Sequence, residues 1–293
     1  MKKIQIDESM GEILFPYIEA IRSNADLPPL LPLVHTTRFD DGIKHIKNNN
    51  KITKPEGDDT CECFDYNPVY LFYGIPGYWP RKKDPLQAGN EPLIFILNEK
   101  YLEECLKDII AIYPCDTGAH KHGFYSKNTI GINWCFWRFR NCFKMGSDAS
   151  ILRKYVEIFF GDNQNYWECG RDDDRAKPER GKLAGNAIID AFVELLENPK
   201  DSRLDERRGI VEIQTKEIES LAEYLQAIVI CDGDISDENK WLLDELKKNG
   251  IEIIEYPKKY ETSYADEYIS SEEKGMIRKK VFEIISRKEC DIV

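Results

Sequence analysis

The chain has 293 residues, of which 42% are hydrophobic and 32% are charged, and its formal net charge is −12. This length supports one large domain or two small ones, without a disulfide or a metal to hold the fold together. The negative charge argues against broad, non-specific binding to nucleic acid, which requires lysines and arginines to displace counterions.

The apolar segments and the cysteines of the sequence do not suggest a membrane protein or a secreted protein. No apolar run approaches the ~20 residues that span a bilayer, and the stretch 13–15 is too short for the core of a signal peptide. The nine cysteines are odd in number, irregularly spaced and without a CxxC pair. We therefore expect reduced thiols, a cytoplasmic location and no membrane partner.

The N-terminal third begins with an amphipathic helix. Apolar residues at helical spacing predict this helix over 8–23, and Pro28 and Pro29 end it. A buried strand over 30–36 and a short helix over 39–48 are expected to follow.

The middle of the chain has two further apolar strands and several helices. The strands are predicted over 69–73 and 93–97, and the helices over 99–110, 149–160 and 184–196. Residues 54–62 and the charged stretch 161–182 are interpreted as surface loops.

The last third has the clearest alternation of strands and helices. Strands are predicted over 209–214, 227–231 and 251–256, with a helical turn over 220–225, a helix over 238–249 and a charged final helix over 270–288. The order of elements predicts an α+β fold with a split central β-sheet and flanking helices.

Three segments carry residues that could do chemistry, and each also has a purely structural interpretation. His35 and Thr36 end an apolar strand before a helix, where they could line a cleft, or serve as a core histidine and a helix cap. Tyr73 and Arg81 flank a Gly/Pro-rich aromatic segment that could contact a phosphate-bearing ligand, or be a packed turn. Glu212 alternates with apolar residues in a strand; on its own, this pattern favours a solvent-facing carboxylate over a working one.

Two further segments each have more than one possible interpretation. The run 134–140, with two tryptophans and two arginines, could stack on a single strand or a nucleotide, or be a buried aromatic strand. The run 115–122 contains Cys115, His120 and His122 but lacks a downstream ligand pair, so a loop on the acceptor side of a cleft or an ordinary surface loop is preferred to a metal site.

Taken together, the three segments that contain His35, Tyr73 and Glu212 resemble the His–Tyr–Glu pattern of ADP-ribosyltransferases. The order of elements after Glu212 resembles that of DarT-type DNA ADP-ribosyltransferases. The resemblance implies an ADP-ribosyltransferase-like domain over 30–260 with an insertion near 100–205, preceded by a helical segment 1–29 and followed by a charged helix within 261–293. It implies a cleft between the His35 and Glu212 strands.

The resemblance also implies roles for individual residues. The implied NAD contacts are His35, Thr36, Tyr73 and Arg81. In this arrangement His35 donates a hydrogen bond to a ribose, and Tyr73 lies beside the nicotinamide. Glu212, with Tyr73, becomes the catalytic pair, and no metal is needed. The implied acceptor is a nucleic acid, in single-stranded form, or a nucleotide, and the implied role is a bacterial toxin or phage-defence effector with an antitoxin or another partner protein.

Two other functions remain as alternatives. The first is a non-catalytic binding or scaffold subunit with a degenerate site, for which the charged helix 270–288 would be a docking surface. The second, ranked last, is a metal-dependent nuclease that uses Glu212, His120 and the acidic run 172–174.

Overall fold

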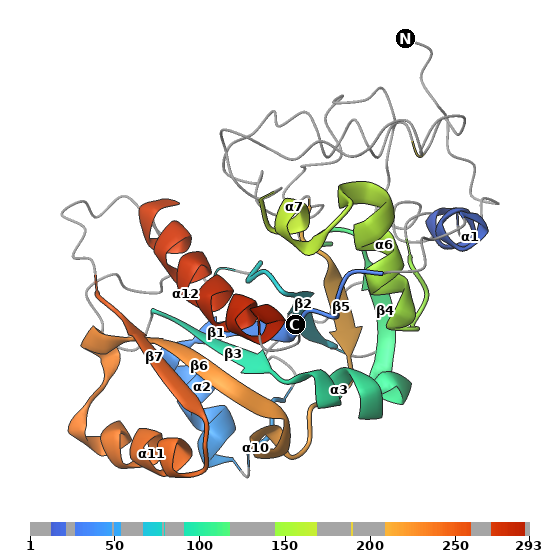
Figure 1. Ribbon diagram of the computed structural model, residues 1–293. Helices are drawn as coiled ribbons and strands as arrows, with labels where there is room; N and C mark the ends of the chain where they lie inside the picture. Colours follow the sequence, from blue (N-terminus) through green and yellow to red (C-terminus); the bar gives the residue numbers. More distant parts are fainter. Residues whose placement is uncertain are drawn as a thin grey trace. The chain divides into compact units, whose positions relative to one another are not determined.

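The computed structural model describes residues 13–21, 27–48, 50–53, 67–77, 79, 91–117, 144–168, 189, 209–258 and 271–290. Within these residues, strands and helices are interspersed along the chain, and the strands form a β-sheet that is flanked by helices (Figure 1). The predicted α+β class is confirmed.

The chain divides into two compact units. The first consists of Met1–Leu30 and Ile109–Gln214, and the second of Leu31–Asp108 and Thr215–Val293. The domain bounds expected from the sequence, including the insertion near 100–205, stay a prediction. His35 belongs to the second unit and Glu212 to the first. The cleft expected between their strands stays a prediction.

The second unit is built on a mixed sheet. Its strands are neighbours in the order β2 (Val69–Tyr73), β1 (Leu33–Arg38), β3 (Pro92–Leu97), β6 (Leu225–Cys231) and β7 (Glu252–Tyr256). The pairs β1–β2, β1–β3 and β3–β6 are antiparallel, whereas β6 and β7 are parallel. The parallel pair is joined through helix α11 (Asp237–Lys248), as the crossover between parallel strands requires.

Helices cover both faces of this sheet. Helix α2 (Phe39–Lys47) packs on β1 and β3, and its Gly42 lies against the side chains of Leu93 and Thr37. Helix α12 (Ser271–Cys290) packs on β6 and β7 from the other face (Figure 1). Because both faces are covered, all six residues of β3 are buried, and its sequence is continuously apolar rather than alternating.

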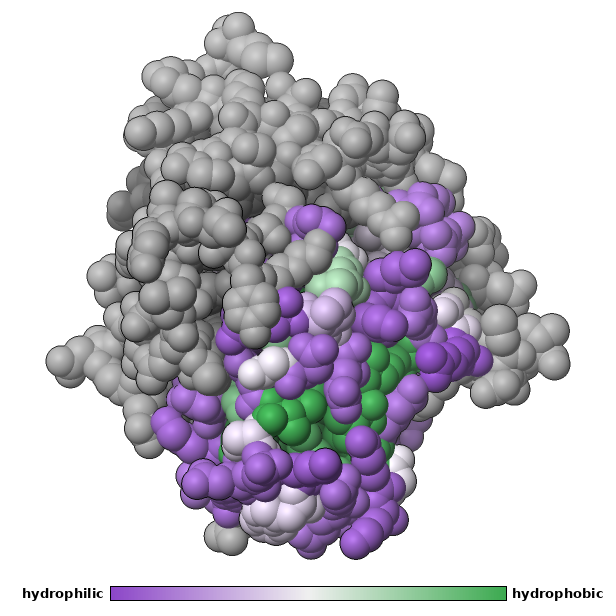
Figure 2. Space-filling view, turned by 90° about the vertical axis from the view of Figure 1, so that its left-hand side faces the viewer, coloured by the Kyte–Doolittle hydropathy of each residue, from purple (hydrophilic) through white to green (hydrophobic). Residues whose placement is uncertain are grey.

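Strand β7 lies at the end of the sheet order and has a different pattern. Glu252 and Glu255 are exposed, and Ile253 and Ile254 between them are half-buried. Figure 2, which views the molecule from the side where β7 and α11 lie in Figure 1, shows a hydrophobic area bordered by hydrophilic residues. Charged side chains on a terminal strand discourage pairing with another chain.

Short helical segments connect the strands of the second unit. They are α3 (Glu99–Glu104), the 3-10 turn η1 (Leu106–Asp108), α10 (Leu221–Tyr224) and the 3-10 turn η3 (Asp232–Asp234).

The first unit contains two strands and three helices within its described residues. They are α1 (Leu14–Ala20), β4 (Ile109–Tyr113), α6 (Ser150–Phe160), α7 (Asn163–Glu168) and β5 (Glu212–Thr215), whose last residue passes into the second unit; β4 and β5 are neighbours. Its core is aromatic, with ring centroids 4.7 Å apart for Tyr155 and Phe159 and 5.2 Å apart for Phe160 and Tyr166. Aromatic pairs of this kind stabilise a core beyond the area they bury.

At two places the structure has a different type of element from the one that the sequence predicts. The helix expected over 99–110 ends at Glu104, and Ile109–Tyr113 is the strand β4, because its β-branched and aromatic residues favour an extended backbone. Helix α7 lies in the charged stretch expected to be a loop. Of the helix expected over 184–196, only Ile189 is described, and it is helical.

Two expectations about the environment can be compared with the described residues. Cys105, Cys115 and Cys231, the cysteines in this part of the chain, are free. No helix within the described ranges combines the length and the apolar character that crossing a membrane requires.

Candidate active site

Strand β5 places Glu212 in the interior of the first unit. The backbone N–H of Val211, just before the strand, donates to the hydroxyl of Tyr166 at 3.1 Å, and all four residues of β5 are buried. Because side chains alternate along a strand, Glu212 and Gln214 lie on one face and Ile213 on the other. Glu212 itself is 1% exposed, so the solvent-facing interpretation of its sequence pattern was wrong.

Three hydrogen bonds hold the Glu212 carboxylate. The backbone N–H of Thr117 donates to Oε2 at 3.0 Å, the Thr117 hydroxyl donates to Oε1 at 2.7 Å, and the Gln214 amide donates to Oε1 at 2.7 Å. All three donors are neutral, and in the described part of the chain no lysine or arginine forms an ion pair with Glu212. The carboxylate is therefore oriented by hydrogen bonds and not neutralised by a counterion.

Burial and a neighbouring carboxylate perturb the ionisation of Glu212. Burial, followed by the charge of Asp116, raises the pKa of Glu212 from 4.5 to about 8, while the hydrogen bonds from Thr117 and Gln214 oppose the rise. A carboxyl group whose pKa lies near neutrality in a buried setting is typical of functional sites.

Asp116 and Thr117 come from the segment that follows β4. They are 4% and 5% exposed and belong to the run 115–122, for which the sequence pattern allowed either a loop on the acceptor side of a cleft or an ordinary surface loop. The remainder of that run, with His120 and His122, lies outside the described residues. The described residues contain no group of histidines, cysteines and carboxylates suited to hold a metal ion.

His35 lies on β1 in the second unit and is half-buried. Its Nδ1 is 2.9 Å from the carbonyl oxygen of Tyr70, and its ring stacks on Phe95 with centroids 6.2 Å apart. Burial is the main cause that lowers the pKa of His35 to about 4, so the ring is neutral at pH 7. A carbonyl can only accept, so Nδ1 carries the proton and Nε2 is an acceptor. In this tautomer Nε2 can accept a hydrogen bond but cannot donate one, whereas the resemblance implied a His35 that donates to a ribose.

Thr36 follows His35 but points to the opposite face of the sheet, because neighbouring side chains alternate along a strand. It is 3% exposed, and its hydroxyl has no hydrogen-bond partner among the described residues. A buried hydroxyl without a partner is energetically unfavourable by about 1–3 kcal/mol, and a ligand that approached this face could supply the missing bond.

Tyr73, expected beside the nicotinamide, belongs to the core of the second unit. Its side chain is fully buried, and its hydroxyl accepts a hydrogen bond from the backbone N–H of Leu31 at 3.0 Å. Contact of this ring with a ligand would require the core to open around it. Arg81 and the aromatic run 134–140 lie outside the described residues.

Gln214 is a site residue that the predicted set lacks, although its sequence position contains a signal. It is two positions after Glu212, which puts both polar side chains on one face of an otherwise apolar strand. Thr117 had no comparable signal of its own, since it is 95 positions away from Glu212 in the chain.

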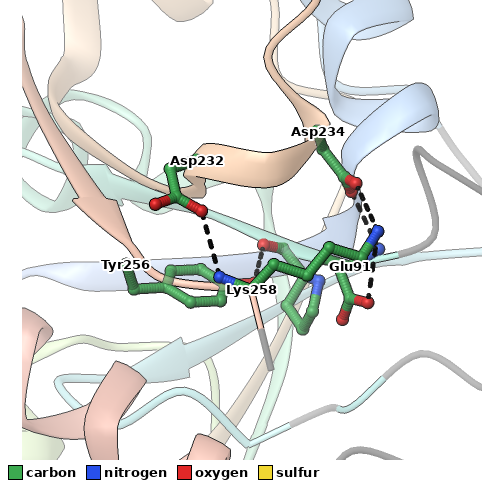
Figure 3. A network of polar contacts seen from close by, with 6 residues as sticks. Glu91, Asp232, Asp234, Tyr256 and Lys258 are labelled. Atoms are coloured by element: carbon green, nitrogen blue, oxygen red, sulfur yellow. Dashed lines mark hydrogen bonds and ion pairs between the residues drawn. The ribbon is translucent and has the colours of Figure 1, made fainter. Parts of the chain in front are cut away.

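A second polar cluster lies in the second unit, at the ends of β6 and β7 (Figure 3). The Lys258 ammonium is 3.0 Å from Asp234 Oδ1 and 3.8 Å from Glu91 Oε1, and the Lys258 backbone N–H donates to Asp232 at 3.0 Å. The Glu91 backbone N–H donates to Asp234 Oδ2 at 3.2 Å. This cluster, the Lys258 cluster, thus contains a cation between two buried carboxylates.

The ionisation of Lys258 reflects this pairing. Burial alone would lower the pKa of Lys258, but the hydrogen bond and the charge of Asp234 and the charge of Glu91 raise it. The ammonium is therefore held in its charged form, and the cluster is electrostatically paired.

Comparison with known proteins gives one distant likeness in structure. No protein-family model and no curated protein matches the chain. The solved structure of Thermus sp. 2.9 DarT in complex with NAD+ is similar to it with a TM-score of 0.38 and 8% sequence identity, over 79% of this chain and 98% of that chain. At this TM-score the likeness carries no weight for function, which must be argued from the side chains.

Proposed function

We propose that the protein is an NAD-dependent ADP-ribosyltransferase, or an NAD glycohydrolase where water is the acceptor, with Glu212 as the catalytic carboxylate. The observation that carries this proposal is the state of Glu212: a carboxylate that is almost fully buried, oriented by three neutral donors and, within the described part of the chain, not paired with a cation. A buried carboxylate of this kind is poorly stabilised until a positive charge comes next to it.

The proposed reaction supplies such a charge. The bond between the nicotinamide nitrogen and C1′ of the ribose breaks, and its electron pair leaves with nicotinamide, which departs neutral. The positive charge then develops on the ribose as an oxocarbenium-like state, as in glycoside hydrolysis. The Glu212 carboxylate stabilises that charge, and a nucleophile adds to C1′ and loses its proton.

Proton linkage favours the same assignment. NAD carries a positive charge on its nicotinamide ring, and a nearby positive charge favours ionisation of a carboxyl group. Approach of the substrate would therefore lower the raised pKa of Glu212 and produce the ionised carboxylate when it is required.

The remaining proposed NAD contacts come from the second unit. The neutral His35 ring offers Nε2 as an acceptor for a ribose hydroxyl. Thr36 is the other proposed contact from this strand, but its hydroxyl is buried on the opposite face, so contact with the same NAD would require that face to open. Arg81 is proposed to contact a phosphate and Tyr73 to support the nicotinamide side from the core. Following the sequence resemblance, we propose a nucleic acid or a nucleotide as the acceptor, and a role as a toxin or defence effector.

The test is nicotinamide release from NAD, with and without single-stranded DNA, RNA and free nucleotides. We expect Glu212→Gln to lower the rate at least about a hundredfold, which corresponds to ~3 kcal/mol of lost transition-state stabilisation. Glu157→Gln, the same change at another buried carboxylate of the first unit, and Glu219→Gln, at an exposed one, should retain the parent rate. Equal rates for Glu212→Gln and the parent would refute the proposal, and label recovered in the acceptor or in free ADP-ribose distinguishes transferase from glycohydrolase.

A non-catalytic scaffold is the second candidate, and the full burial of Tyr73 favours it. Because the Tyr73 ring is buried in the core, it has no exposed surface that NAD can contact, although the resemblance implied that it lies beside the nicotinamide. Absence of nicotinamide release from the parent protein with every acceptor, together with no measurable NAD binding, is the result that this candidate predicts.

A further inference from the structure

Thr117 and Gln214 surround the Glu212 carboxylate with donors from two separate segments of the first unit. Thr117 contributes both its backbone N–H and its hydroxyl, and Gln214 contributes its amide, at distances between 2.7 and 3.0 Å. Both side chains are buried, with Thr117 5% and Gln214 0% exposed, so water does not compete for these bonds.

The direction of the Thr117 hydroxyl follows from a fourth contact. The Gln214 amide nitrogen also lies 3.4 Å from Thr117 Oγ1, and an amide N–H can only donate. The Thr117 oxygen therefore accepts from Gln214, while its own proton is directed to Glu212 Oε1. The three hydrogen bonds that reach Glu212 are then all donated to its carboxylate, which is the arrangement that favours its ionised form.

We propose that Thr117 and Gln214 are positioning residues for Glu212: they hold its carboxylate in one orientation and keep it able to ionise despite burial and the nearby Asp116. The functional part of this inference rests on the proposed function. Asp116 is the titratable group that acts on Glu212 within the described residues, and it opposes the two positioning residues, because a like charge favours the protonated form.

The test removes the Thr117 hydroxyl and follows the titration of Glu212. Thr117→Val keeps the shape and the backbone N–H but deletes one donor, whereas Thr117→Ser retains it. A hydrogen bond to a charged group shifts a carboxyl pKa by about one unit, so Thr117→Val should move the midpoint of Glu212 about one pH unit upward, and Thr117→Ser should leave it unchanged. The readouts are the carbon-13 chemical shift of the Glu212 carboxyl against pH, and the pH at which nicotinamide release reaches half of its maximum.

Two controls separate positioning from a general effect on packing. Thr215→Val deletes another buried hydroxyl of β5, one bonded to Tyr101 and to the Asp108 carbonyl instead of Glu212, and should not move the midpoint. Gln214→Met removes the amide donors at similar volume, should shift the midpoint in the same direction, and replaces Thr117→Val if that variant does not fold. A Glu212 midpoint equal to that of the parent in Thr117→Val and in Gln214→Met would overturn the proposal. Because the carbon-13 titration needs no catalysis, failure of the proposed reaction is seen separately, as absent nicotinamide release from the parent.

Discussion

The Glu212 site and the Lys258 cluster are two solutions to the burial of carboxylates in one chain. In the Lys258 cluster, an ammonium lies 3.0 Å from Asp234 and 3.8 Å from Glu91. Among the described residues Glu212 has no such cation; its partners there are the neutral donors of Thr117 and Gln214, and its charged neighbour, Asp116, has the same sign. One cluster contains a counterion for its carboxylates, and for the other the described residues supply none.

The difference distinguishes the structural role that we expect for the Lys258 cluster from the catalytic role that we propose for Glu212. Paired buried charges contribute little net stability, but loss of one partner leaves an isolated buried charge. An unpaired buried carboxylate with a perturbed pKa makes the folded state less stable in its ionised form, and such groups are retained mostly where they do chemistry. The two clusters should therefore respond oppositely to removal of charge.

The largest effect on stability is expected at Lys258. Lys258→Met keeps most of the aliphatic stem and removes the cation that lies between the buried carboxylates of Asp234 and Glu91. We expect a loss of about 3–5 kcal/mol in the free energy of unfolding, measured by urea denaturation at pH 7. Lys51→Met is the matched control: Lys51 also lies between two carboxylates, Glu217 and Glu219, but in a more exposed setting, so the loss should stay within about 1 kcal/mol. Equal losses for both variants would abolish the distinction between the clusters.

Removal of charge at Glu212 should have the opposite sign and depend on pH. Because the pKa of Glu212 is raised from 4.5 to about 8 in the folded state, its contribution to stability is fully present below pH 4.5 and is lost as the pH rises through 8. Glu212→Gln has no ionisation at this position, so its free energy of unfolding relative to the parent should rise between pH 5 and pH 8, on the order of a few kcal/mol. Thermal unfolding of both proteins across this range is the measurement. A constant difference across the range would mean that Glu212 is not buried in its charged form.

The smallest effect tests how closely the Lys258 cluster is packed. A Cβ added at Gly233 would lie 2.8 Å from Cδ and 2.9 Å from Cβ of Lys258, so Gly233→Ala should displace the lysine stem and destabilise the fold by about 1–2 kcal/mol. Gly275→Ala in α12 meets no atom within 4 Å and should be neutral or slightly stabilising, because alanine favours a helix. Denaturation midpoints of the two variants decide this, and an unaffected Gly233→Ala would show that Lys258 can rearrange freely.

Much of the second unit was predictable from local sequence patterns. The strand Val69–Tyr73 has its predicted bounds, and α2 and α11 lie within about one residue of theirs at each end. These elements have strong apolar periodicity and clear end signals such as Gly250, whose φ of 83° suits a glycine after a helix. The strand β4 was missed because a short apolar run next to a helix fits either structure until its neighbours are known.

The sequence by itself determined the α+β class and singled out Glu212 and His35 as residue types able to do the proposed chemistry. Only the tertiary structure decided their states: that Glu212 is buried, that Thr117 from 95 positions away orients it, and that the Tyr70 carbonyl fixes the His35 tautomer. Helix and strand preferences depend on neighbours a few positions apart, and the sequence contains them directly. The ionisation of a side chain depends on burial and on charges and dipoles within a few ångströms, which residues distant in the chain supply only when it folds.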